Sequence, residues 1–226
     1  MDTLVWKWSK KGSFSTKYVY DFLTKDESVR HLKHIWKAKI PYEIENFMWL
    51  VENNAILTKD NLLRRHWIGD PTCYFCNENE SIDHLFFLCP IARITWGIIG
   101  FCFGANSAPK NMQQYRFWIA KWLPGGNQMY TSGCAAICWA IWKCRNRACF
   151  DKKLLKHSCE IITHACSFLT YWAGLYNDVT HERILDGVQK LLACAHGVLA
   201  TQQGASPALR LLPSPPEDEQ DDGGNN

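Results

Sequence analysis

Apolar side chains recur at helical spacing in the middle of the chain. Between Pro41 and Asn53 they fall at the i, i+3, i+4 and i+7 positions that share one face of a helix. The residues on this predicted face are Ile44, Phe47, Met48 and Val51. Proline suits the first turn of a helix, because an N–H at that position would have no intrahelical partner. The pattern therefore predicts an amphipathic helix that begins at Pro41 and ends near Asn53.

More helices are predicted further along the chain. Thr58 is a good N-cap for a short helix that carries Asp60 near its positive end. Pro90 predicts the start of another helix, which continues to Gly104. Four further helical patterns follow at about 112–122, 130–150, 153–176 and 179–200.

The first 23 residues show a different pattern. Residues 4–8 and 13–15, separated by a turn at Gly12, predict a short β-hairpin. Ser15 or Thr16 then caps a predicted helix that runs through Leu23. The predicted fold class is therefore mainly α with a short N-terminal β-hairpin.

Composition and charge indicate a globular, basic body with an acidic tail. Hydrophobic residues make up 47% of the 226, with 11 Trp and 11 Phe, which is typical of a chain that folds around a core. The formal net charge is +3, but residues 214–226 carry five acids and no base, so the preceding 213 residues carry +8. A basic body suits a nucleic-acid partner. Residues 202–226 are rich in Pro, Gly, Ser and acids and are expected to be disordered.

We expect a soluble, intracellular protein of a reducing compartment, in the nucleus or the cytoplasm. The N-terminus has no apolar signal-peptide region. The longest uncharged apolar run, residues 94–105, has about 12 residues where a membrane span needs roughly 20, so no membrane partner is expected. The 11 cysteines, an odd number at irregular spacing, are then thiols or metal ligands rather than disulfides.

The strongest chemical signal is the stretch CYFCNENESIDHLFFLC at residues 73–89. Its spacing is C-x2-C-x7-H-x4-C, and the candidate ligands are Cys73, Cys76, His84 and Cys89. Three thiolates and one imidazole favour Zn²⁺, which binds them tetrahedrally at about 2.0–2.3 Å. Four protein ligands leave no open position, so the pattern predicts one structural zinc that performs no reaction. The alternative is a set of buried thiols around a core histidine.

The charge of this stretch argues against direct contact with nucleic acid. Three thiolates, a neutral imidazole and Zn²⁺ sum to −1, and Glu78, Glu80 and Asp83 add more negative charge, so a phosphate would be repelled at short range. Nucleic-acid contacts are therefore assigned to flanking bases, with a solvated basic face as the alternative for each. These bases are Lys7, Lys10, Lys11, Lys17, Lys59, Arg64, Arg65 and Arg93.

Several segments share their order and spacing with a known family. They are Trp8, GSFSTKYVYDFL (12–23), IWKAKIPYEIENFMWLVENNAILTKDNLLRR (35–65), CYFC (73–76) and DHLFFLCPIARITW (83–96). In these features residues 6–97 resemble the reverse-transcriptase zinc-binding domain of plant non-LTR (LINE-type) retroelement polyproteins. The stretch CWAIWKCRNRACF (138–150) is similar to the segment that joins this domain to a ribonuclease H domain. The resemblance implies an accessory zinc domain that works beside catalytic ones.

The chain departs from that family in its catalytic motifs. It has no YxDD-type polymerase motif, and no convincing set of ribonuclease H carboxylates follows Phe150. Asp178, Glu182 and Asp186 recur at i, i+4 and i+8, for which a solvated helix face is the simpler interpretation. The chain is therefore predicted to be no enzyme and to take no small-molecule substrate.

The predicted organisation has three parts: a zinc-binding domain at residues 1–104, a helical region at 105–201 that resembles the linker before ribonuclease H, and the acidic tail at 202–226. The domain is expected to assist nucleic-acid binding by reverse-transcription machinery. Its expected partners are RNA or DNA and a reverse transcriptase or ribonuclease H domain. A vestigial scaffold that binds a partner protein, and a carboxylate-dependent nuclease, are the alternatives.

Other cysteines, histidines and tryptophans are assigned to the core. In HSCEIITHAC (157–166), the pair His157 and His164 and the pair Cys159 and Cys166 point about 160° apart on a helix, so no second metal site is expected. Most tryptophans lie on apolar helix faces, which favours packing over base stacking.

One basic cluster lies outside the zinc segment. Lys143, Arg145 and Arg147 follow Trp142 at alternate positions.

Overall fold

The computed structural model describes residues 32–126 and 129–204. In these ranges the chain forms helices joined by loops, and its β-structure is a single bridge between Thr72 and Asn79. The mainly α prediction is confirmed. The predicted N-terminal hairpin and the helix through Leu23 lie outside the described residues. The helices are α3 (Lys33–Lys37), α4 (Tyr42–Glu52), α5 (Lys59–Arg64), the π-helix η1 (His84–Leu88), α6 (Pro90–Cys102), α7 (Met112–Trp122), α8 (Tyr130–Phe150), α9 (Cys159–Ala173) and α10 (Asp178–Gly204).

The predicted helix starts agree with the structure where local signals are strong. Pro41 directly precedes α4, and all four residues of the predicted apolar face are buried. Pro90 occupies the first turn of α6, which ends before Gly104, a residue with a φ of +71°. Thr58 is the N-cap of α5, but its hydroxyl donates to the Asp60 carboxylate at 2.5 Å instead of accepting from a backbone N–H.

Two predicted boundaries differ from the structure in the C-terminal half. The helix predicted from residue 153 begins only at Cys159, because residues 151–158 turn the chain between α8 and α9. Lys152 takes a φ of +56° in this turn, and the Lys153 N–H donates to the Arg147 carbonyl. At the other end, α10 continues to Gly204 rather than ending near residue 200.

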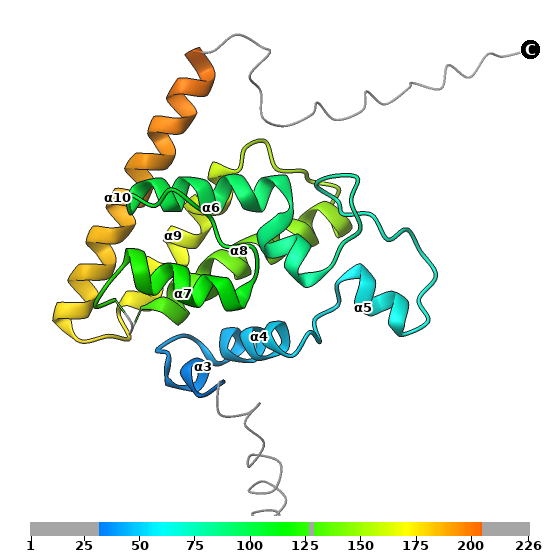
Figure 1. The fold of residues 1–226 in the computed structure, drawn as a ribbon, viewed down its shortest axis with the longest axis horizontal. Helices are drawn as coiled ribbons and strands as arrows, with labels where there is room; N and C mark the ends of the chain where they lie inside the picture. The colour runs from blue at the N-terminus through cyan, green and yellow to red at the C-terminus, as the bar shows by residue number, and fades with distance from the viewer. Residues whose placement is uncertain (1–31, 127–128, 205–226) are drawn as a thin grey trace, which may run out of the picture.

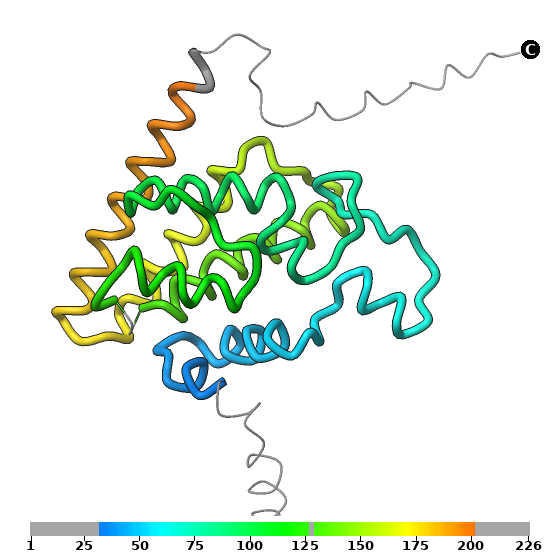
Figure 2. Tube along the Cα trace, in the orientation of Figure 1, coloured from blue at the N-terminus to red at the C-terminus, as the bar shows by residue number. Residues whose placement is uncertain are grey.

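Helix α8 lies at the centre of the described part of the chain. It contacts α4, α7, α9 and η1, and α10 packs along α9 and α6 before its C-terminal end extends beyond the body (Figure 1). One continuous apolar core includes side chains from α3, α4, η1, α6, α7, α8 and α9, and a smaller cluster lies among α6, α9 and α10. The trace in Figure 2 shows the same arrangement without the ribbons. The predicted boundary at residue 104 therefore does not coincide with a gap in the core.

None of the described helices combines the length with the apolar character that a membrane crossing requires.

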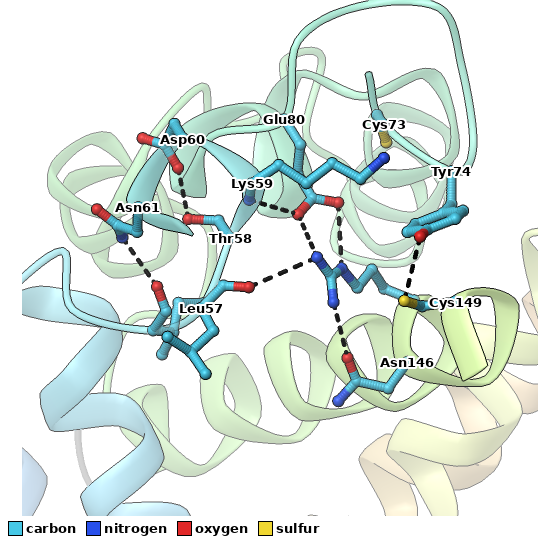
Figure 3. A network of polar contacts seen from close by, with 12 residues as sticks. Leu57, Thr58, Lys59, Asp60, Asn61, Cys73, Tyr74, Glu80, Asn146 and Cys149 are labelled. Carbon is cyan, nitrogen blue, oxygen red and sulfur yellow. Dashed lines mark hydrogen bonds and ion pairs between the residues drawn. The ribbon is translucent and has the colours of Figure 1, made fainter. Parts of the chain in front are cut away.

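A buried ion pair joins the segment around the bridge to α8 (Figure 3). Glu80 is 1% exposed and Arg145 is 4% exposed. The Arg145 Nη2 donates to Glu80 Oε1 at 2.7 Å and its Nε donates to Oε2 at 3.2 Å, which gives the two-point geometry of the strongest carboxylate pairs. The Lys59 N–H donates to the same carboxylate at 3.0 Å. The pair thus links α5, the bridge segment and α8.

A second buried contact supports the junction between η1 and α6. In an α-helix the Phe86 carbonyl would accept from the residue four positions on, but that residue is Pro90, which has no N–H. The Trp96 indole Nε1 donates to this carbonyl instead, at 2.7 Å. Trp96 is itself fully buried and stacks on Phe87 with ring centroids 5.6 Å apart. One side chain therefore both fills the core and satisfies an otherwise unpaired carbonyl.

The Glu80→Gln substitution tests the buried ion pair. It leaves the Arg145 guanidinium buried without a counter-charge, so the free energy of unfolding should fall by about 3–5 kcal/mol. Urea unfolding of the metal-loaded protein, followed by tryptophan fluorescence, measures this change. Asp186→Asn is the matched control, because it breaks the exposed pair with Lys190 and should cost about 0–1 kcal/mol. Equal effects of the two substitutions would contradict a stabilising role for the buried pair.

The Trp96→Phe substitution tests the second contact. It removes the donor from the buried Phe86 carbonyl and leaves space in the core, so we expect a loss of about 2–4 kcal/mol. The same urea titration applies. Trp36→Phe, on α3 with a ring 47% exposed, is the control and should change stability by about 0.5 kcal/mol or less.

Candidate metal centre

The first two candidate ligands lie on a tight hairpin. The Cys73 N–H donates to the Glu78 carbonyl at 2.8 Å, and the Glu80 N–H donates to the Pro71 carbonyl at 2.9 Å. The chain between these bonds must turn back within a few residues, and this turn carries Cys76. The Phe75 N–H lies 3.4 Å from the Cys73 Sγ, a contact that stabilises a thiolate. The hairpin thus aims both sulfurs at one point.

The other two ligands are brought together by a π turn. On an α-helix, residues five apart point about 140° away from each other, so His84 and Cys89 would diverge. The Cys89 N–H instead donates to the His84 carbonyl at 2.7 Å, which closes the wider turn of η1. Cys89 then leaves the helical conformation as the N-cap of α6, with φ −53° and ψ 139°. The wider turn returns Cys89 to the side of His84.

The four ligand atoms form one compact cluster. All of them lie within 4.8 Å of one another. The Cys76 Sγ is 3.2 Å from the His84 Nε2 and 4.0 Å from the Cys89 Sγ. Tetrahedral zinc with bonds of 2.0–2.3 Å would separate two sulfurs by about 3.8 Å and a sulfur from a nitrogen by about 3.6 Å. The donor set and its spacing therefore fit Zn²⁺.

Burial and hydrogen bonding alter the pKa values of the cysteine thiols in the cluster. Cys73, His84 and Cys89 are buried, and Cys76 is half-buried. The hydrogen bond from Cys89 lowers the pKa of Cys73 to about 4, so one thiolate is present at neutral pH. The same contact with Cys73, together with burial, raises the pKa of Cys89. A divalent cation would displace the remaining thiol protons, so its affinity should fall as the pH falls.

The apolar residues between His84 and Cys89 pack the cluster against the core. Leu85, Phe86 and Phe87 are buried, whereas Leu88 is 44% exposed. The polar residues 77–79 lie exposed at the opposite side of the hairpin. All four donors come from the protein, so the arrangement leaves no position for a substrate.

The interpretation of Glu80 as part of a repulsive acidic surface is wrong. Its carboxylate is buried and neutralised by Arg145, so only Glu78 and Asp83 remain as exposed acids in this segment. The pairing spans 65 residues and has no signature in local spacing. The one available signal is that Arg145 lies four residues after the buried Ile141, on the inward face of α8.

The described nucleic-acid candidates lie on two different helices, α5 and α6. Arg64 pairs with Asp60 at 2.9 Å, and Arg65 reaches the Ala55 carbonyl at 3.4 Å. Arg93 is exposed on the first turn of α6, a different element. Lys7, Lys10, Lys11 and Lys17 lie outside the described residues.

The assignment of Lys59 as a nucleic-acid contact is wrong. It is only 4% exposed, its Nζ donates to the Thr72 carbonyl, and it lies 4.1 Å from the centre of the Tyr74 ring. A lysine held in this way supports the hairpin and cannot reach a phosphate.

The remaining cysteines and histidines form no second group of three metal ligands within residues 32–126 and 129–204. Cys144 lies 3.6 Å from the His164 Nδ1, and Cys134 lies 3.9 Å from Cys138, all in the interior or at its edge. His157 is exposed and separate.

Comparisons with known proteins agree with the ligand geometry. A family model described as "zinc-binding in reverse transcriptase" matches residues 14–96. A putative ribonuclease H protein of Arabidopsis thaliana is 30% identical over 164 residues, which cover 64% of this chain and 25% of that protein. The chain thus matches about a quarter of its relative's length. No solved structure matches the chain significantly.

The matched range contains the four clustered ligand residues and the π turn that brings two of them together. Residues 14–96 are therefore the reverse-transcriptase zinc-binding domain of a retroelement-type protein.

Proposed function

We propose that Cys73, Cys76, His84 and Cys89 hold one structural Zn²⁺. We further propose that the domain stabilised by this ion assists nucleic-acid binding by reverse-transcription machinery without catalysing a reaction. The observation that carries the proposal is the closed cluster of three sulfurs and one nitrogen within 4.8 Å. Such a set suits zinc and leaves no position for an attacking water.

A structural ion explains how a short hairpin keeps its shape. Residues 71–80 contribute few apolar side chains, and their backbone pairing is limited to a single bridge and its neighbouring bonds. Zinc would join this hairpin to the start of α6 through Cys89. The ion would thus stabilise the hairpin and not only the ligands.

The nucleic-acid role is supported by charge and by family. The first 213 residues carry a net charge of +8, and the matched domain occurs in reverse transcriptases. The zinc cluster itself is a poor phosphate site, because its three thiolates outweigh the ion and Glu78 and Asp83 lie beside it. The contacts are therefore assigned to lysines and arginines on the surrounding surface. A reverse transcriptase or ribonuclease H domain is the proposed protein partner.

The absence of catalysis is part of the proposal. Asp178, Glu182 and Asp186 are all exposed on α10, and Asp186 pairs with Lys190 at 2.6 Å. A two-metal nuclease needs carboxylates that converge in a pocket, and these three line a solvated helix face. The domain organisation is proposed from the resemblance and the composition: a zinc domain at residues 1–104, a helical region at 105–201 and an acidic tail at 202–226.

One observation favours the scaffold alternative. Trp36, Tyr42 and Trp49 on α3 and α4 are 47%, 72% and 40% exposed. Exposed aromatic side chains are frequent in protein interfaces. A scaffold role predicts a protein partner that co-purifies with the chain even after nuclease treatment.

Metal content tests the zinc site. Elemental analysis of the reduced protein should give one zinc per chain, and Cys73→Ser or His84→Ala should remove it. Because structural zinc contributes roughly 10–16 kcal/mol to the folding of small peptides, either variant should also expose residues 70–90 to proteolysis. Cys102→Ser, a half-buried thiol outside the cluster, is the control and should keep its zinc. No stoichiometric metal in the wild-type protein would overturn the site.

Electrophoretic mobility shifts test the nucleic-acid role. The zinc-loaded protein should bind RNA or DNA at low salt, and the affinity should fall steeply as salt rises, because phosphate contacts release counterions. No binding even at low salt would remove the role and leave the scaffold alternative.

A further inference from the structure

The C-terminal end of α8 and the turn that follows form a concentrated basic surface. Residues 143–157 contain six lysines and arginines and one acid, Asp151. Arg145 is buried against Glu80, and the other five basic side chains are exposed or half-exposed. We call these five the α8 basic surface: Lys143, Arg147, Lys152, Lys153 and Lys156.

Within the described part of the chain, the five side-chain charges form no salt bridges, although the Glu160 carboxylate accepts from the Lys156 backbone N–H at 3.0 Å and lies beside the surface. Lys143 has only a long cation–π contact, with its Nζ 5.8 Å from the centre of the Trp139 ring. Arg64, by contrast, is paired with Asp60, and Arg93 stands alone on α6. The α8 basic surface therefore offers more unpaired positive charge than Arg64 or Arg93 does within the described residues.

The surface also exposes apolar side chains among its charges. The Phe150 ring is 74% exposed at the last residue of α8, and Leu154 is 49% exposed in the turn. Lysines near a helix C-terminus do favour the helix dipole, but the dipole amounts to about half an elementary charge, against five cations here. It also gives no reason for an exposed phenyl ring. Positive charge around an exposed aromatic ring is the combination that proteins use to bind single-stranded nucleic acid.

The zinc domain holds this surface in place. Directly before Phe150, the Cys149 Sγ lies 3.1 Å from the Tyr74 hydroxyl (Figure 3), and Tyr74 directly follows the candidate ligand Cys73. The Glu80–Arg145 pair anchors the preceding turn of α8 to the same hairpin. The hairpin of residues 71–80 therefore supports α8, which carries the basic surface, although the charge of the zinc cluster itself would repel phosphate.

We propose that the α8 basic surface binds single-stranded RNA or DNA, with its lysines and Arg147 on phosphates and the Phe150 ring stacked on a base. This assignment rests on the proposed nucleic-acid role and gives it a location outside the family-matched residues 14–96. An acidic protein segment could satisfy the charges, but it would have no specific use for the flat face of the phenyl ring.

Fluorescence anisotropy with labelled 20-nucleotide single strands tests the proposal on the full-length, zinc-loaded chain. The test variant replaces Lys143, Lys152, Lys153 and Lys156 with Gln. The control variant makes the same change at four exposed lysines on other elements, Lys33, Lys37, Lys110 and Lys121. Each lost phosphate contact lowers the slope of log affinity against log salt by about 0.7, so the test variant should lose about 3 from this slope and bind at least tenfold more weakly. The control variant should lose much less.

Phe150→Ala separates nucleic acid from other polyanions. Stacking on a base predicts roughly a tenfold loss of affinity for single strands and little change for duplexes, whose bases are already stacked. A Lys→Arg variant at the four test positions should restore binding, and zinc content and circular dichroism should match the wild type in every variant.

The outcomes distinguish the surface from the broader role. If the wild type binds and the test and control variants weaken equally, the α8 basic surface is not the site, while the proposed function stands. If the wild type binds no strand at low salt, both the α8 site and the proposed nucleic-acid role are overturned. If polyglutamate competes as well as oligonucleotide and Phe150→Ala has no effect, the surface binds an acidic protein segment and the nucleic-acid assignment is overturned.

Discussion

The ion pair between Glu80 and Arg145 is the contact on which the rest of the arrangement depends. The metal hairpin is short and has little apolar surface of its own, so it must be held from outside. The buried carboxylate receives two hydrogen bonds from α8 and one from the first residue of α5, and it thereby joins three segments that are distant in sequence. A buried pair of this kind contributes modestly as a pair, but the loss of either partner leaves an uncompensated charge in the interior. The positions of the hairpin and of α8 therefore depend on each other.

The ligand cluster depends on a local departure from α-helical geometry. A regular helix after His84 would carry Cys89 to the wrong side, and the π turn corrects this at the cost of regular backbone pairing. Pro90 starts α6 but removes one more donor, and the Trp96 indole supplies the missing hydrogen bond. A single buried tryptophan thus allows a metal ligand and a helix start to occupy adjacent positions.

Charge is divided between two neighbouring parts of the molecule. The candidate metal cluster has exposed acids beside it, whereas the five cations of the α8 basic surface form no ion pair with any residue that the structure describes. The Cys149–Tyr74 contact places these parts next to each other. If α8 binds the strand as proposed, the zinc domain would contribute to nucleic-acid binding without touching the strand, by holding α8 in place. The family-matched range ends at residue 96, but the apolar core continues beyond it into α8.

Local patterns in the sequence were sufficient to locate α4 and α6, to identify four candidate ligands by spacing, and to assign the chain to a mainly α fold. These features depend on residues a few positions apart, and helical periodicity, proline at a helix start and metal-ligand spacing all act over that range. Only the tertiary structure decided that Glu80 is buried against Arg145, that Lys59 supports Tyr74 instead of facing solvent, and that α9 begins at Cys159. Pairing between residues 65 positions apart is set by how the helices pack, and no local spacing rule records which buried charge will meet which partner.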